Sequence, residues 1–165
     1  MKRRHLVMGG AASLTLGACG APSKFQRYTG PDVTAIVVEK KERRMFLLHK
    51  GQILDNYKVR LGFAPDGHKQ YEGDGRTPEG VYRIDRRNPN SRYHLSLGIS
   101  YPNSRDIAVA NAMGLKPGGD IFIHGTPKEY VGEPDWTWGC IAVTNDEIEV
   151  IYAMVKNGTP IFIYP

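Results

Sequence analysis

Three things are scarce in this 165-residue sequence: cysteine, long hydrophobic segments and, once the first residues are set aside, an excess of positive charge. Beyond one apolar stretch near the N-terminus, no segment is long and apolar enough to be a transmembrane helix. Residues 1–18 contain three of the 22 Lys and Arg residues and none of the 17 Asp and Glu residues, which leaves 19 basic side chains against 17 acidic ones. A nucleic-acid partner is therefore not expected, because little positive charge remains to neutralise phosphates.

The N-terminus has the pattern of a secretory signal. A basic segment, Met1–Arg4, precedes a mostly apolar stretch, Leu6–Leu16, that is too short to span a membrane. The following Gly-Ala-Cys19 completes a resemblance to a bacterial lipobox, whose cysteine is lipidated and becomes the first residue of the mature chain; the alternative is an ordinary signal peptide cleaved nearby. We therefore expect a signal peptide over residues 1–18, exported by the Sec or Tat route, and a lipidated N-terminus and tether over residues 19–32. The expected location is the periplasmic face of a bacterial membrane.

If Cys19 carries a lipid, Cys140 is the only thiol left, in a compartment that oxidises thiols. It then has no disulfide partner and no second cysteine for a zinc site, and no metal or organic cofactor is expected from the rest of the chain. An unpaired thiol in such a compartment is a liability unless it is deeply buried or reactive. Both readings stay open at this point, because free cysteine is among the most buried residue types.

A candidate catalytic pair lies in two neighbouring segments. In Asp120-Ile-Phe-Ile-His124-Gly-Thr126 an apolar run leads a histidine into a glycine turn, and in Asp135-Trp-Thr-Trp-Gly139-Cys140 a Trp-Gly step precedes the cysteine. A free thiol has a pKa near 8.5, and histidine is the side chain suited to accepting its proton at neutral pH. We expect two strand ends to bring His124 against Cys140 and to lower the pKa of the thiol, with His94 as the alternative base.

Short strand-like segments separated by Gly and Pro turns dominate residues 33–165, which we expect to form one domain. Strands are predicted over Val33–Glu39, Arg44–His49, Gln52–Leu61, Val81–Asp85, Tyr93–Tyr101, the run ending at His124, the run starting at Ile141, and Thr159–Tyr164. Two helices are predicted, over Arg105–Met113 and from a capping box at Thr144–Glu147 to about Asn157. A hairpin is expected to turn at Lys50-Gly51. This pattern predicts a mainly β sandwich with mixed strands and two short helices.

Order and spacing exclude several other sites. Papain-like and NlpC-type peptidases place the cysteine before the histidine, whereas here the histidine comes sixteen residues earlier. A cysteine phosphatase needs an arginine six residues after the thiol, where this chain has Asp146. The Gly-rich segment Gly73–Gly80 is not a phosphate-binding loop, because it lacks a Gly-Lys-Ser/Thr ending and does not lead into a helix.

The remaining match is specific. His124-Gly-Thr, Gly139-Cys140 and Asn145, preceded by Gly75-Arg-Thr-Pro-Glu-Gly80, resemble the L,D-transpeptidase (YkuD-type) catalytic domain over roughly residues 33–164. The resemblance implies a mainly β sandwich that remodels peptidoglycan, the cell-wall polymer. Such enzymes use cysteine to attack the L,D-peptide bond of a tetrapeptide stem and release D-alanine, and the acyl group then passes to an amine of another stem, a protein lysine or water.

The resemblance also assigns roles. It implies that Cys140 is the nucleophile, that His124 accepts and donates its proton, that Gly139 keeps the oxyanion pocket open, and that Gly125 and Thr126 support the site. The expected partners are peptidoglycan stem peptides and, through the N-terminal lipid, the bacterial membrane.

Two positions depart from the family pattern, which is Ser-His-Gly-Cys with an arginine two residues beyond the cysteine. This chain has Trp138 in place of the second histidine and Ala142 in place of the arginine, so the acyl acceptor stays open. The first reading is an L,D-transpeptidase that cross-links the wall or attaches a protein to it. The second is an L,D-carboxypeptidase, endopeptidase or amidase that uses water. The third is a lipoprotein that binds peptidoglycan without turnover, with Trp136 and Trp138 as a platform.

Overall fold

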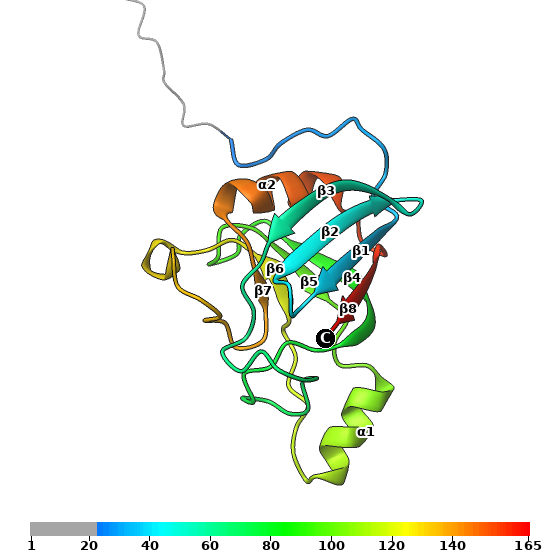
Figure 1. The fold of residues 1–165 in the computed structure, drawn as a ribbon, viewed down its shortest axis with the longest axis vertical. Coiled ribbons are helices and arrows are strands. Elements are labelled where there is room, and N and C mark those ends of the chain that lie inside the picture. Colours follow the sequence, from blue (N-terminus) through cyan, green and yellow to red (C-terminus); the bar gives the residue numbers. More distant parts are fainter. Residues whose placement is uncertain (1–22) are drawn as a thin grey trace, which may run out of the picture.

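The computed structural model describes residues 23–165 (Figure 1). The predicted signal peptide and Cys19 lie outside this part of the chain, and the proposed divisions at residues 18 and 32 stay predictions. Within residues 23–165 no helix has both the length and the apolar character needed to cross a membrane.

Eight strands form one mixed sheet in the order β3-β2-β1-β8-β4-β5-β6-β7. The strands are β1 (Ala35–Glu39), β2 (Arg44–His49), β3 (Gln52–Lys58), β4 (Gly80–Asn88), β5 (Ser96–Ile99), β6 (Phe122–His124), β7 (Ile141–Ala142) and β8 (Pro160–Tyr164). Three helical segments accompany them: α1 (Ser104–Ala112), α2 (Asn145–Met154) and a short 3₁₀ turn, η1 (Lys128–Tyr130). The pairs β1–β8 and β6–β7 are parallel, and the other neighbouring pairs are antiparallel.

The sheet folds back on itself because β4 belongs to both of its halves. Residues 80–83 of β4 pair with β8, and residues 84–88 pair with β5. A register shift between Ile84 and Arg86 marks the change of partner, as expected where a bulge bends a strand. In Figure 1 the half made of β1, β2 and β3 therefore lies in front of the half made of β5, β6 and β7. The predicted mainly β sandwich with mixed strands and two short helices is confirmed.

The hydrophobic core fills the space between the two halves. Alternate residues of β1, β2 and β8 are buried in it, and Ile36, Ile84, Ile123 and Ile161 are fully buried. Helix α2 lies across one end of the core and contributes residues such as Ile148 and Ile151 (Figure 1). Burial of this kind stabilises the fold by about 25 cal/mol for each Å² of apolar surface removed from water.

Turn and capping residues in the sequence predicted the positions of several elements correctly. Lys50 and Gly51 both have positive φ, at 48° and 84°, which is the geometry of a two-residue type I′ hairpin. Thr144 and Glu147 form the predicted capping box at the start of α2. The helix ends at Met154, earlier than the predicted Asn157, because Val155 is extended and buried in the core.

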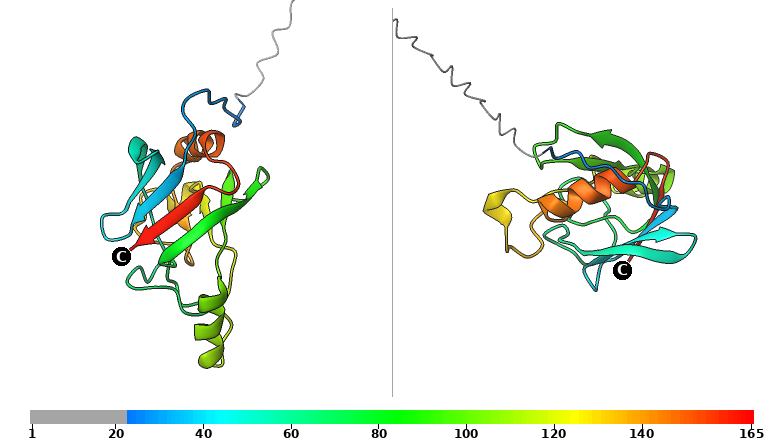
Figure 2. Two further views of the ribbon diagram at one scale, coloured as in Figure 1. Left: turned by 90° about the vertical axis from the view of Figure 1, so that its right-hand side faces the viewer. Right: turned by 90° about the horizontal axis from the view of Figure 1, so that it is seen from above.

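Helix α1 projects from the end of the molecule opposite α2 (Figure 2). Asn103 caps its N-terminus in a capping box with Asp106, and only Asp106 and Ala110 of the helix are buried. Residues 23–32 instead run beside α2 (Figure 1). There the ammonium of Lys24 donates hydrogen bonds to the carbonyls of Pro89 and His94, at 2.7 and 3.0 Å.

Candidate active site

The candidate pair lies on adjacent strands at one end of the sheet. His124 is the last residue of β6, and Cys140 directly precedes β7. The parallel register places His124 opposite Ala142. Side chains two residues apart share a face of a strand, so Cys140 and Ala142 lie on the same face as His124. The fold thus brings together the two residues that the sequence singled out, with Cys140 offset from His124 by one step of two residues along the strand.

His124 is held tightly by its surroundings. Its side chain is 2% exposed, and its Nδ1 donates a hydrogen bond to the carbonyl oxygen of Gly125 at 2.7 Å. The ring of Tyr93 stacks on the imidazole with centroids 4.4 Å apart, and Trp136 meets it edge-on at 5.7 Å. Because Nδ1 carries the proton, Nε2 is left as the basic nitrogen. Burial lowers the pKa of His124 to about 4, although the bond to Gly125 acts in the opposite direction.

Cys140 is half-buried, and its thiol points toward the start of β6. Sγ donates a weak hydrogen bond to the carbonyl oxygen of Asp120 at 3.5 Å. Burial raises the pKa of Cys140 to about 11, although the backbone N–H of Phe122 and the charge of Lys69 act to lower it. Within residues 23–165 no hydrogen bond joins Sγ to His124. The expectation that His124 lowers the pKa of Cys140 is therefore wrong for the resting site, because desolvation outweighs every favourable interaction with the thiolate.

Gly139 is required by the turn that presents the cysteine. Its φ is 124°, and a Cβ at this position would lie 2.5 Å from the carbonyl oxygen of Arg76. The hydroxyl of Thr137 donates to the carbonyl of Cys140 at 2.7 Å and accepts the N–H of Gly139 at 3.2 Å, so it closes the turn from inside. Thr137 was not singled out from the sequence, although it stands where the family pattern Ser-His-Gly-Cys has its serine.

An ion pair fixes the start of the same segment. The guanidinium of Arg43 donates to the carboxylate of Asp135 from Nε and Nη2, at 2.9 and 2.7 Å to Oδ2. The other oxygen, Oδ1, accepts the backbone N–H of Leu61 at 2.8 Å. The chain from Asp135 to Cys140 is therefore attached to the β1–β2 turn and to the segment after β3, which are far from it in sequence.

Gly125 and Thr126, the two residues after His124, fix the position of this strand end through close backbone contacts. A Cβ at Gly125 would lie 2.3 Å from Oδ1 of Asn145, so only glycine allows α2 to begin this close to β6. The hydroxyl of Thr126 donates to the carbonyl oxygen of Val143 at 2.7 Å and joins the ends of β6 and β7. Both residues thus hold the strand that carries His124.

An open hollow of about 860 Å³ leads to Cys140. Lys69, Lys116, Glu72 and Asp120 contribute to its walls, so groups of both charges line the approach to the thiol. Trp138 forms part of the rim with 71% of its surface exposed, and its ring meets the ring of Phe63 edge-on at 5.0 Å. A hollow of this size, with apolar and polar walls, can hold a peptide segment.

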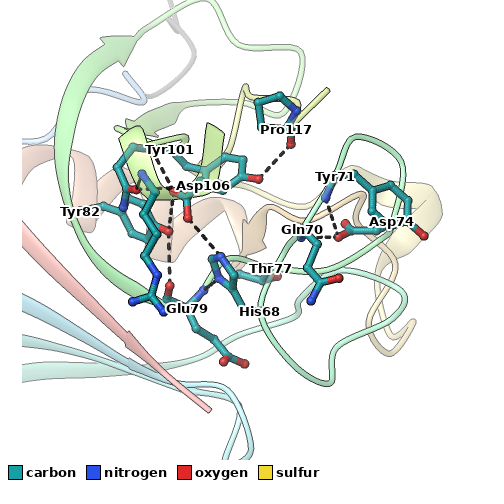
Figure 3. Close-up of polar contacts among 12 residues, drawn as sticks. His68, Gln70, Tyr71, Asp74, Thr77, Glu79, Tyr82, Tyr101, Asp106 and Pro117 are labelled. Atoms are coloured by element: carbon teal, nitrogen blue, oxygen red, sulfur yellow. Dashed lines mark hydrogen bonds and ion pairs between the residues drawn. The ribbon is translucent and has the colours of Figure 1, made fainter. Parts of the chain in front are cut away.

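Polar contacts order the loop that borders this hollow (Figure 3). Asp74 accepts the backbone N–H groups of Gln70 and Tyr71, at 2.7 and 3.2 Å. His68 accepts the N–H of Glu79 at Nδ1, and its Nε2 lies 3.1 Å from Asp106 of α1 (Figure 3). The wall of the hollow is thus built on a rigid network.

Some sequence candidates lie elsewhere. His94, the alternative base, bonds to Glu149 of α2 through Nε2 at 2.7 Å. Tyr101, at the end of the strand predicted over Tyr93–Tyr101, donates to the carbonyl of Pro117 at 2.9 Å and packs on Tyr82. Trp136 covers His124, and the ring of Tyr130 from η1 stacks on it at 4.1 Å.

Comparison with known proteins decides the family. The profile of the L,D-transpeptidase catalytic domain (YkuD) matches residues 33–163. The chain belongs to this family.

Individual relatives agree with the assignment. YafK from Escherichia coli (strain K12), provisionally named an L,D-transpeptidase, is 34% identical over 129 residues, which cover 74% of this chain and 47% of YafK. The helical cell shape determining protein Pgp2 from Campylobacter jejuni superimposes with a TM-score of 0.61 at 25% identity, over 87% of this chain and 51% of Pgp2. Bd1075 from Bdellovibrio bacteriovorus gives a TM-score of 0.58 at 28% identity, over 81% of this chain and 48% of Bd1075.

More distant L,D-transpeptidase domains share the fold. The L,D-transpeptidase from Mycobacterium smegmatis has a TM-score of 0.54 at 15% identity, over 81% of this chain and 59% of that protein. The present chain spans about half the length of YafK, Pgp2 and Bd1075. What is common to all of them is the curled mainly β domain.

Proposed function

We propose that this L,D-transpeptidase domain catalyses cysteine-dependent acyl transfer on peptidoglycan stem peptides. The observation that carries the proposal is the placement of His124 and Cys140 on one face of adjacent parallel strands, with the thiol at the wall of an open hollow. An enzyme that forms an acyl intermediate needs a nucleophile, a base near it and room for a peptide, and the thiol, the imidazole and the hollow at this end of the sheet support that assignment.

The resting pair is a neutral thiol and a neutral imidazole, so the proton moves during attack. Sγ of Cys140 leaves the Asp120 carbonyl and bonds to the stem carbonyl carbon, while its proton passes to Nε2 of His124. The tetrahedral intermediate collapses, the carbon–nitrogen bond breaks, and the imidazolium returns the proton to the departing D-alanine amine. A thioester on Cys140 remains. The Nδ1 bond to Gly125 keeps the imidazole oriented and stabilises its charged form while it holds the proton.

The thioester is then consumed by an acceptor. Attack by an amine of a second stem or of a protein lysine forms a new amide and frees the thiol, which is transpeptidation. Attack by water releases the acid instead, as in an L,D-carboxypeptidase, endopeptidase or amidase. Ala142 favours water as a second candidate acceptor, because this fully buried, uncharged side chain offers an incoming charged stem no contact beyond the nucleophile.

Product analysis tests both steps. The protein is incubated with disaccharide-tetrapeptide, and intact mass spectrometry looks for an acyl adduct on Cys140. Cys140→Ser should lose at least about 10³-fold of the activity, since the nucleophile and its base act as a unit. Cross-linked dimers identify transpeptidation, and trimmed stems alone identify hydrolysis. Stem binding without either product or adduct would favour the non-catalytic reading, and full turnover by Cys140→Ser would remove the nucleophile assignment.

The proposal extends to the location of the enzyme. A lipid on Cys19 would hold the domain at the periplasmic face of a bacterial membrane, with about 0.8 kcal/mol of affinity for each buried methylene. Cys19→Ala should move the protein from washed membranes to the soluble fraction with unchanged turnover. Retention of this variant on the membranes would place the anchor elsewhere.

A further inference from the structure

Residues 24–26, named here the strap, fasten the segment before β1 to the loop between β4 and β5. The ammonium of Lys24 donates hydrogen bonds to the carbonyl oxygens of Pro89 and His94, at 2.7 and 3.0 Å. These two carbonyls stand at opposite ends of residues 89–94, so one cation bridges the loop. Hydrogen bonds donated by an ammonium are stronger than those between neutral groups. Lys24 therefore restrains a loop that lies 65 to 70 residues further along the chain.

Gln26 reaches the same loop through α2. Its side-chain amide donates to Oε2 of Glu149 at 3.1 Å, and Oε1 of Glu149 bonds to Nε2 of His94 at 2.7 Å. The ring of Phe25 packs on Tyr152 of the same helix, with centroids 6.5 Å apart. The strap thus holds His94 at two points, directly at its carbonyl and through Glu149 at its imidazole.

His94 depends on such support because of its backbone conformation. Its φ is 71°, in the left-handed region that residues with a side chain seldom occupy. A conformation of this kind persists only where the surrounding structure fixes it. Without the strap, the loop can relax at His94, and the neighbouring Tyr93 then moves with it.

Tyr93 contacts the candidate base in two ways. Its ring stacks on the imidazole of His124, with centroids 4.4 Å apart and planes 26° from parallel. Its carbonyl oxygen accepts the N–H of Gly125 at 3.0 Å. The carbonyl of Gly125 in turn accepts the Nδ1 proton of His124 at 2.7 Å. Tyr93 therefore holds both the imidazole and the residue that orients it.

We propose that Lys24 and Gln26 are positioning residues for His124, which they hold in place through Tyr93. The two strap side chains fix the turn at His94, this turn presents Tyr93, and the ring of Tyr93 keeps the imidazole oriented and shielded from water. The proposal rests on the proposed function, because a base is needed only if the thiol performs acyl transfer. The segment that follows the expected lipid anchor then takes part in catalysis as well as in attachment.

The pKa of His124 measures its contact with Tyr93. Burial lowers this pKa to about 4, and Tyr93 and Trp136, which pack on the imidazole, carry no charge in mild acid. Lys24→Met removes the ammonium and leaves an uncharged, flexible side chain. In the full chain, labelled at histidine and titrated by NMR, this variant should raise the pKa of His124 from about 4 towards 6.5, because the imidazole becomes exposed. Gln26→Leu, which breaks only the link through α2, should give a smaller rise.

Turnover supplies a second measurement. With disaccharide-tetrapeptide, Lys24→Met should lower kcat by at least about tenfold, since a misplaced base slows attack by the thiol. KM should stay nearly unchanged, because the strap does not line the hollow that leads to Cys140. A loss of stability alone would not separate kcat from KM in this way.

Matched variants separate positioning from stability, and thermal midpoints show that each variant is folded. Lys156→Met removes an exposed ion pair with Asp32, at the other end of the same N-terminal segment, and should leave the pKa of His124 unchanged. Lys24→Arg keeps a cationic donor and should restore most of the low pKa. Tyr93→Ala should raise the pKa of His124 by itself, whereas Tyr93→Phe should keep it low because the ring remains. Lys24→Met added to Tyr93→Ala should have little further effect, because both changes act on one contact.

The outcomes are distinct from those of the acyl-transfer test. An unchanged His124 pKa in Lys24→Met, or an equal rise in Lys156→Met, would overturn the positioning role even if Cys140 forms an acyl adduct. Additive effects of Lys24→Met and Tyr93→Ala would overturn the route through Tyr93. Conversely, the expected rise without an acyl adduct in the parent protein would support the hold of the strap on His124 and contradict the catalytic proposal.

Discussion

The imidazole of His124 and the carbonyl oxygen of Gly125 are joined by a hydrogen bond 2.7 Å long, so the protein backbone plays the part that a carboxylate plays in a Ser-His-Asp triad. A carbonyl orients the ring as a carboxylate does, but it brings no full negative charge to stabilise an imidazolium. The site therefore rests with both partners neutral. Three of the predictions below concern this pair or the turn beside it.

Alkylation of Cys140 should report an ordinary buried thiol in the free protein. The iodoacetamide rate, measured on the Cys140 peptide by mass spectrometry, should keep rising towards pH 11, because burial raises the pKa of Cys140 to about 11. His124→Ala should give nearly the same profile and yet lose turnover, since its base acts only during attack. A wild-type plateau below pH 8 that moves upward in His124→Ala would instead show a resting thiolate–imidazolium pair.

The buried imidazole should make the protein less stable in mild acid. Its pKa is lowered from 6.5 to about 4 in the folded state, so between these values the unfolded chain binds more protons than the folded one. The free energy of unfolding should therefore be lower at pH 4 than at pH 6.5 by on the order of 3 kcal/mol. This figure follows from about 1.4 kcal/mol for each unit by which the pKa is lowered. Urea unfolding of His124→Gln should lack most of this slope. The control is His49→Gln, beside the β2–β3 hairpin, and an equal loss of slope there would contradict the assignment to His124.

Gly139→Ala should be far more damaging than the same change at Gly158. Both glycines have positive φ, at 124° and 90°, but an added Cβ meets the Arg76 carbonyl only at Gly139 and open space at Gly158. Gly158→Ala should lose about 1–2 kcal/mol from backbone strain alone. Gly139→Ala should lose a further 1–3 kcal/mol or so from overlap, together with turnover, as Cys140 moves. Chemical denaturation measures the loss of stability of each variant, and kinetics measure its turnover. Similar losses at the two positions would mean that the turn around Gly139 adjusts to a Cβ without cost.

Asp135→Asn tests whether the ion pair with Arg43 positions the cysteine. The amide keeps an oxygen for the Leu61 N–H but loses the charge that Arg43 binds. Because the two side chains are 28% and 15% exposed, the cost should lie between surface and buried pairs, at about 1–2 kcal/mol. Asp85→Asn, in the exposed pair with Arg86, should cost less than about 0.5 kcal/mol. Thermal unfolding compares the stabilities of the two variants. A loss of stability in Asp135→Asn no larger than in Asp85→Asn would mean that the Arg43–Asp135 pair does not hold this segment in place.

Local features of the fold could be predicted from the sequence, whereas its long-range features could not. The Lys50-Gly51 hairpin and the Thr144–Glu147 capping box depend on neighbouring residues, and both were predicted correctly. The double pairing of β4 depends on which distant strands meet its two ends, and residue types along β4 do not specify this.

The same limit applies to the site. Motif and order predicted His124 and Cys140 as the catalytic pair, and their roles stay predictions. The resting pKa of Cys140 was not, because it depends on burial contributed by segments far along the chain. Arg43 was missed for the same reason, because its partner Asp135 lies far along the chain and only folding brings the two together.

The parallel pairing of β1 with β8 makes the closure of the sheet a late step in the synthesis of the domain. Ile36 of the first strand lies beside Ile161 of the last one, so the central seam of the sheet joins segments made at opposite times. Contacts of such high sequence separation form late and slowly, because a long loop must close before they are made. Until residues 160–164 have emerged, β1 has no partner on that side and β4 no support for its first half. In a growing chain this central seam of the sheet therefore stays open until β8 has been made.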